Sequence, residues 1–118
     1  MFSLLGIGAM ILAGAFVVCV IALTVKWIKN KFREKLALKN AKKAAIADIK
    51  ELVENCDNRM SLEELDRIAS KEGYTHVMAT VDNNGQIMGD LELIKDTSGG
   101  SSDVQRLLGD NGMRVVEK

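Results

Sequence analysis

Few side chains in this sequence have the types and spacing that catalysis requires. The chain of 118 residues contains one histidine, His76, and two cysteines, Cys19 and Cys56. A single histidine without a Cys-x-x-Cys pair does not form a recognisable zinc site, and no glycine-rich phosphate-binding motif occurs. Cys56 and His76 could in principle form a nucleophile–base pair, but nothing in their spacing supports one. We therefore expect a non-enzymatic protein without a metal or another cofactor.

Asp82-Asn83-Asn84-Gly85 contains oxygen ligands of the kind that calcium prefers. In the calcium-binding EF-hand loop, however, the glycine stands at the sixth position and a glutamate at the twelfth. Counted from Asp82, Gly85 is only the fourth residue. The segment is therefore predicted to be a hairpin turn rather than a calcium site.

The first element of the chain is an apolar run without Asp, Glu, Lys or Arg over residues 2–25. About 20 such residues suffice to cross the hydrocarbon core of a bilayer as a helix, so the sequence predicts a single-pass transmembrane helix over residues 1–25. A buried core helix and a cleaved signal peptide are the alternatives. Small residues on one face of this helix would permit close helix–helix packing in the membrane; they are Gly6, Ala9 and Ala13.

Charge is unevenly distributed along the chain. Residues 26–50 contain nine Lys or Arg and two acidic residues, whereas residues 51–118 contain seven and fourteen. Because basic flanks stay on the cytoplasmic side, we expect a cell-membrane protein with its N-terminus outside and residues 26–118 in the cytoplasm. The flank should bind anionic lipid headgroups through Lys26, Trp27, Lys29, Lys31, Arg33 and Lys35. Nucleic acid is not expected as a partner, because aromatic residues make up only 4%.

The basic segment, residues 26–56, is predicted to continue the membrane helix as an amphipathic helix. Residues 33–56 contain neither glycine nor proline and are rich in good helix formers. One apolar stripe recurs at helical spacing; it consists of Leu38, Ala41, Ala45, Ile49, Leu52 and Cys56. This stripe must be buried against the rest of the chain, a second copy or a partner.

Residues 57–118 are predicted to form a small acidic α+β domain. A capping box at Ser61–Glu64 begins a helix over residues 62–72. Period-two alternation then predicts strands over residues 74–81 and 86–93. A second capping box, Ser102–Gln105, begins a helix that ends at Leu108, and residues 113–116 form the last strand. The order helix-strand-strand-helix-strand indicates a mainly antiparallel three-stranded sheet.

The hairpin register follows from the alternation. A three-residue loop, residues 83–85, pairs Val81 with Ile87 and keeps one face apolar. It also requires Gly85 to adopt the left-handed conformation. The same register pairs Ala79 with Gly89 and Val77 with Leu91, and it places His76 opposite Glu92 on the other face.

These features together favour a membrane-anchored interaction or adaptor protein that presents its cytoplasmic domain to a protein partner or a second copy. Two methionines and a tyrosine on the polar face of the hairpin suggest a surface that something covers. The candidate partner face consists of Tyr74, His76, Met78, Met88 and Asp90. The alternatives are a membrane-tethered ligand-binding domain or enzyme with an unrecognised site, and a small holin-like membrane-active protein.

Overall fold

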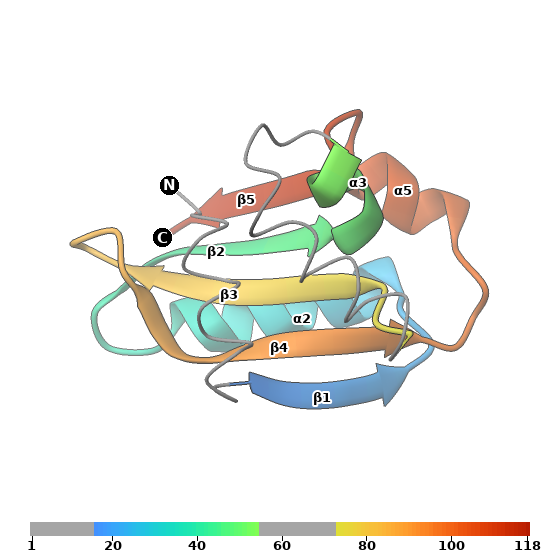
Figure 1. The fold of residues 1–118 in the computed structure, drawn as a ribbon. Coiled ribbons are helices and arrows are strands. Elements are labelled where there is room, and N and C mark those ends of the chain that lie inside the picture. The colour runs from blue at the N-terminus through green and yellow to red at the C-terminus, as the bar shows by residue number, and fades with distance from the viewer. Residues whose placement is uncertain (1–15, 55–72) are drawn as a thin grey trace.

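A computed structural model of the chain describes residues 16–54 and 73–118. These residues form an α+β fold with a five-stranded mixed sheet in the order β1-β4-β3-β2-β5 (Figure 1). The elements are β1 (Phe16–Ile21), α2 (Val25–Leu36), β2 (Ala41–Asp48), α3 (Ile49–Glu54), β3 (His76–Asp82), β4 (Ile87–Asp96), α5 (Ser102–Leu108) and β5 (Met113–Glu117).

The predicted membrane helix over residues 1–25 is wrong, because part of it is a strand. Phe16–Ile21 forms β1, which pairs in parallel with β4 along its whole length, Phe16 opposite Leu91. The segment Val-Val-Cys-Val-Ile is rich in β-branched residues, which fit a pleated sheet. Among residues 16–54 and 73–118, no helix is both long and apolar enough to cross a membrane.

The predicted topology fails with the membrane helix. The single-pass cell-membrane topology depended on that helix, and the strand at Phe16–Ile21 contradicts it. The small residues proposed for helix packing in the membrane, Gly6, Ala9 and Ala13, lie outside the described residues.

The continuous basic helix over residues 26–56 is also wrong. Helix α2 begins at Val25, where the Thr24 hydroxyl accepts a hydrogen bond from the Trp27 N–H, and it ends at Leu36. A turn follows over residues 37–40, and Asn40 in it has a φ of 71°, a conformation that a helix does not contain, directly before β2 begins at Ala41. Residues 44–47, Ala-Ala-Ile-Ala, are buried on both faces of this central strand. Packing in the sheet thus outweighs the helix propensity of alanine.

Helix α2 connects two parallel strands. Strands β1 and β2 run in the same direction, and such strands need a long crossover connection. Figure 1 shows α2 crossing behind β3 and β4. Ile28 and Phe32 of α2 are buried in one cluster with Ile46 and Met78 of the sheet. The core on the opposite face contains Val77, Leu91 and Leu93.

The C-terminal half of the predicted domain is confirmed in part. Helix α5 and strand β5 form where the sequence predicts them, although the helix cap is Ser101 rather than Ser102. The sheet has five strands rather than three, because β1 and β2 join it. The predicted helix over residues 62–72 lies outside the described residues.

The hairpin register is confirmed at the turn and wrong beyond it. Val81 pairs with Ile87, and Gly85 has the expected positive φ of 78°. A bulge then shifts the register by two residues, so that Val77 pairs with Leu93 and His76 with Ile94. Gly89 lies at this bulge with a φ of 61°. A shift of two residues keeps every side chain on its predicted face.

We predict that Gly112→Ala destabilises the fold more than Gly85→Ala. Both glycines have positive φ, which costs an alanine about 1–2 kcal/mol. A Cβ at Gly85 would contact nothing within 4 Å, whereas one at Gly112 would lie 2.4 Å from the Glu51 Cβ on α3. Crowding of this kind adds about 1–3 kcal/mol. Urea denaturation of both variants measures the difference, and equal losses would contradict the prediction.

Candidate functional site

The predicted partner face on the hairpin is not a single exposed surface. Met78 and His76 are buried, Tyr74 and Met88 are half-buried, and only Asp90 is exposed. Met78 packs in the same cluster as Ile28 and Phe32 of α2. Met78 is therefore covered by α2 of the same chain, not by a partner.

Glu92 forms the main polar contact between α2 and the sheet. The predicted register places its side chain on the polar face of the hairpin, yet the residue is only 4% exposed. Its Oε1 lies 3.3 Å from the Lys31 Nζ and 2.9 Å from the Lys35 Nζ. The Glu92 Oε2 is buried and has no hydrogen-bond partner within residues 16–54 and 73–118. We call these three residues the Glu92 ion-pair cluster.

The residues predicted to bind lipid headgroups are divided between two environments. Lys31 and Lys35 belong to the Glu92 ion-pair cluster. Trp27 packs against the core, with the Lys31 Nζ 5.9 Å from the centre of its ring. Lys26, Lys29 and Arg33 are exposed. Their binding to anionic lipid stays a prediction.

Strand β1 forms one edge of the sheet and carries three exposed valines. Val17, Val18 and Val20 are 45%, 44% and 61% exposed. No charged residue occurs between Phe16 and Ile21. An edge strand presents unpaired N–H and C=O groups, and natural edges are normally protected by charges, prolines or bulges. Strand β1 has none of these along its length, and none of the described strands pairs with its outer edge. This outer edge, which we call the free edge of β1, is therefore competent to pair with another strand.

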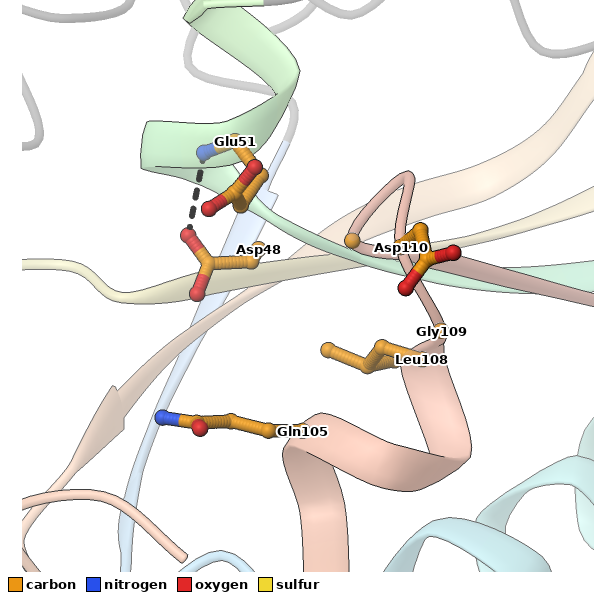
Figure 2. A pocket seen from close by; sticks show the side chains of 7 residues that line it. Asp48, Glu51, Gln105, Leu108, Gly109 and Asp110 are labelled. Atoms are coloured by element: carbon orange, nitrogen blue, oxygen red, sulfur yellow. Dashed lines mark hydrogen bonds between the residues drawn. The ribbon is translucent and has the colours of Figure 1, made fainter. Parts of the chain in front are cut away.

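A cleft lies at one end of the central strands, where β2 ends beside α3 and α5. It consists of two adjoining hollows of about 260 and 270 Å³, and Asp48 and Gln105 line both. Figure 2 shows Gln105 and Leu108 projecting from α5 on one side of the first hollow, with Asp48 and Glu51 on the other. Asp48 Oδ1 accepts hydrogen bonds from the backbone N–H groups of Lys50 and Glu51 at 2.9 and 3.2 Å. We call these two hollows the acidic cleft.

His76 lines the second hollow of the acidic cleft. Its Nδ1 lies 2.8 Å from the Thr75 hydroxyl oxygen, which donates its one hydrogen to the Ile94 carbonyl. The ring is thus hydrogen-bonded to Thr75 on one side, and on the other side its Nε2 lies 4.0 Å from the Asp48 Oδ2.

Burial lowers the pKa of His76, and the carboxylates of Asp48 and Asp96 oppose this shift without reversing it. The imidazole is therefore neutral near pH 7. Burial alone would raise the pKa of Asp96, but hydrogen bonds from the Ser98 side chain and from the Leu23 and Ser98 backbones outweigh it and lower that pKa. Asp96 is therefore a carboxylate at neutral pH.

The other candidate chemistry from the sequence has no support from the geometry. Within residues 16–54 and 73–118, no group of three or more His, Cys, Asp or Glu side chains could hold a metal ion. Cys56 lies outside the described residues, so the pair with His76 stays untested. Burial raises the pKa of the Cys19 thiol, helped by the charge of Glu92, and Lys31 and Lys35 oppose this shift. The Cys19 thiol is therefore not an activated nucleophile.

No local sequence pattern indicates the acidic cleft. Asp48 stood within the predicted helix over residues 33–56, far along the chain from His76 and Asp96. The sheet order brings the three residues to one end of adjacent strands β2, β3 and β4. The period-two pattern of the hairpin does place His76 on the polar face, and the acidic cleft lies beside this face.

We predict that removing both lysines of the Glu92 ion-pair cluster is more damaging than removing the glutamate. Lys31→Met with Lys35→Met leaves a buried carboxylate without partners, which costs about 3–5 kcal/mol. Glu92→Met leaves two ammonium groups whose side chains are 22% and 24% exposed and can turn to water. The triple variant should regain most of the lost stability. Urea denaturation of the three variants tests this, and additive losses would contradict it.

We further predict that His76 makes the fold less stable in mild acid. The unfolded chain binds a proton near pH 6.5, whereas folded His76 binds it only at lower pH. The unfolded chain thus holds more protons in this interval, so stability falls as the pH drops through 6.5 and levels off below the folded-state pKa. His76 is the only histidine, so His76→Gln should remove this part of the pH dependence in urea denaturation between pH 7.5 and 5. An unchanged slope in the variant would contradict the assignment.

Comparison with known proteins adds neither a relative nor a structural neighbour. No family model, no curated protein and no solved structure matches the chain. The two candidate sites, the free edge of β1 and the acidic cleft, are therefore assigned from their geometry and chemistry alone.

Proposed function

We propose that the chain is a non-enzymatic interaction module that assembles with a second copy of itself through the free edge of β1. The observation that supports this function is the charge-free edge strand with its three exposed valines. The proposal keeps the interaction role that the sequence favours. It moves the contact from the polar face of the hairpin, which α2 largely covers, to the edge of the sheet.

A second copy suits this edge because β1 is self-complementary. In an antiparallel pair about a two-fold axis, each strand presents the same surface to the other. If the axis lies between Val18 and Cys19, Val17 faces Val20 of the other copy and Phe16 faces Ile21. Every residue of β1 then meets an apolar residue, and no charge is desolvated. The backbone hydrogen bonds would join two sheets into one.

The opposite edge of the sheet lacks this property. Strand β5 carries Arg114 and Glu117, both exposed. Glu117 also forms an ion pair with Lys43 of β2, with 3.1 Å between Oε1 and Nζ. Charges of this kind protect an edge against pairing. The difference between the two edges favours a closed dimer through β1 over an open chain of copies.

We predict that the full chain is a dimer in solution and that Val20→Lys makes it a monomer. Lysine at this position of the edge strand opposes pairing because it would face an apolar residue of β1 in the other copy and lose its hydration. Val20 is 61% exposed, so the folded monomer should tolerate the change. Sedimentation velocity and light scattering measure the mass, and thermal denaturation confirms that the variant is folded.

The matched control is Val115→Lys on β5, where the valine is 46% exposed. This variant adds the same charge to the other edge and should remain a dimer. A monomeric wild-type chain at all concentrations would refute the proposal. So would a Val115→Lys variant that dissociates while Val20→Lys stays dimeric.

A further inference from the structure

We propose that the chain binds the surface of an anionic lipid bilayer through the outer side of α2 and the turn after it, and that two copies bind it together. The first part depends on the residues of one chain only, and the second part rests on the dimer through β1 proposed above. Contact of this kind needs no helix that spans the membrane. We define the basic face as Lys26, Lys29 and Arg33 of α2 with Leu38 and Lys39 of the turn.

The three basic residues of α2 lie in one row along the helix. Lys29 and Arg33 follow Lys26 by three and seven positions, a spacing that brings side chains to the same side of a helix. All three residues are exposed, whereas Ile28 and Phe32 are buried against the sheet. The row therefore points away from the sheet.

The charges of the basic face take no part in the ion pairs of the fold. Lys31 and Lys35, on another side of α2, are both bonded to Glu92. Glu34 is the only acidic residue of α2, and its Oε1 lies 3.9 Å from the Lys31 Nζ. Within residues 16–54 and 73–118, none of the four basic side chains of the basic face forms an ion pair. Their charge is therefore available to an anionic partner.

An exposed leucine favours lipid over other anionic partners. Leu38 is 46% exposed, and Lys39 beside it is exposed as well. The Ala41 N–H and the Lys118 Nζ both donate hydrogen bonds to the Leu38 carbonyl, at 3.2 and 3.3 Å, and hold the turn in place. An apolar side chain among lysines can enter the boundary between headgroups and acyl chains while the amines stay at the phosphates. The outer phosphates of a nucleic acid duplex offer no such apolar layer.

The dimer through β1 brings two basic faces to one side. A two-fold axis that pairs β1 with itself in antiparallel orientation stands perpendicular to the sheet, so both copies turn the same face to the same side. Helix α2 lies behind β3 and β4 in Figure 1, so both α2 helices lie on one side of the joined sheet. Each basic residue adds a modest attraction to an anionic surface. Two linked basic faces therefore bind much more tightly than one.

Flotation of the full chain with vesicles tests the proposal. We expect binding to vesicles of phosphatidylcholine mixed with phosphatidylserine, none to phosphatidylcholine alone, and a decrease as NaCl rises. A chain that does not float with the mixed vesicles would overturn the lipid proposal, and it would leave the dimer to the mass measurement above. Release by duplex DNA at an equal concentration of phosphate would also overturn it, because the basic face would then bind any polyanion.

Two charge reversals locate the contact. Lys29→Glu should weaken binding to the mixed vesicles about tenfold or more. The matched control is Lys50→Glu, which changes the net charge equally at an exposed position of α3, where Ile49 packs on the opposite face of the sheet. This control should bind like the wild-type chain. Equal weakening by both reversals, or by neither, would refute the basic face, and thermal denaturation confirms that both variants are folded.

The two lysine variants of the strands test whether two copies bind together. Val20→Lys adds a positive charge but should bind the mixed vesicles more weakly than the wild-type chain, because it is a monomer. Val115→Lys adds the same charge, keeps the dimer and should bind at least as tightly as the wild-type chain. Equal binding by the two variants would overturn joint binding by two copies, whereas Lys29→Glu would still decide on the basic face of the single chain.

Discussion

The buried carboxylate of Glu92 determines where α2 can lie. Glu92 is 4% exposed, so its carboxylate has lost most of its contact with water. Burying a charge without a partner costs much free energy, so this carboxylate needs a cationic partner. Lys31 and Lys35 stand one helical turn apart and both reach the same oxygen, Oε1. This double contact fixes the position of the helix over β4. Ion pairs of this kind contribute little net stability compared with apolar packing, so their main effect is to select one arrangement.

The position of α2 determines which surfaces of the sheet remain available. With α2 in place, Ile28 and Phe32 close one face of the sheet over Met78 and Ile94. The residues on the polar face of the β3–β4 hairpin therefore lie under α2 or beside it. Among the described strands, β1 and β5 are the two edges of the sheet, and each pairs with one neighbour only. Strand β1 is the edge without a charged residue.

Local rules predicted the elements whose pattern is unambiguous. The alternation of the hairpin strands, the Gly85 turn and the end of α5 at Leu108 each depend on neighbouring residues, and all appear in the structure. Phe16–Ile21 fits a membrane helix and a buried strand equally well by hydropathy, and only pairing with β4 distinguishes them. Ala44–Ala47 has helix propensity, yet burial between β3 and β5 makes it a strand. The contacts that decide both cases join residues far apart in sequence, so no window of sequence contains them.

The acidic cleft was unpredictable for the same reason, and its geometry depends on backbone anchors rather than on flexible side chains. Thr75 holds the Nδ1 of His76 and is itself bonded to Ile94 and Asp96 on β4. The Asp96 Oδ1 accepts from the backbone of Leu23, which follows β1, and from Ser98. The side chains of His76 and Asp96 are therefore held by hydrogen bonds that join β3, β4 and the segment after β1. The shape of this part of the cleft thus follows from the pairing of strands that are distant in sequence, which no local pattern contains.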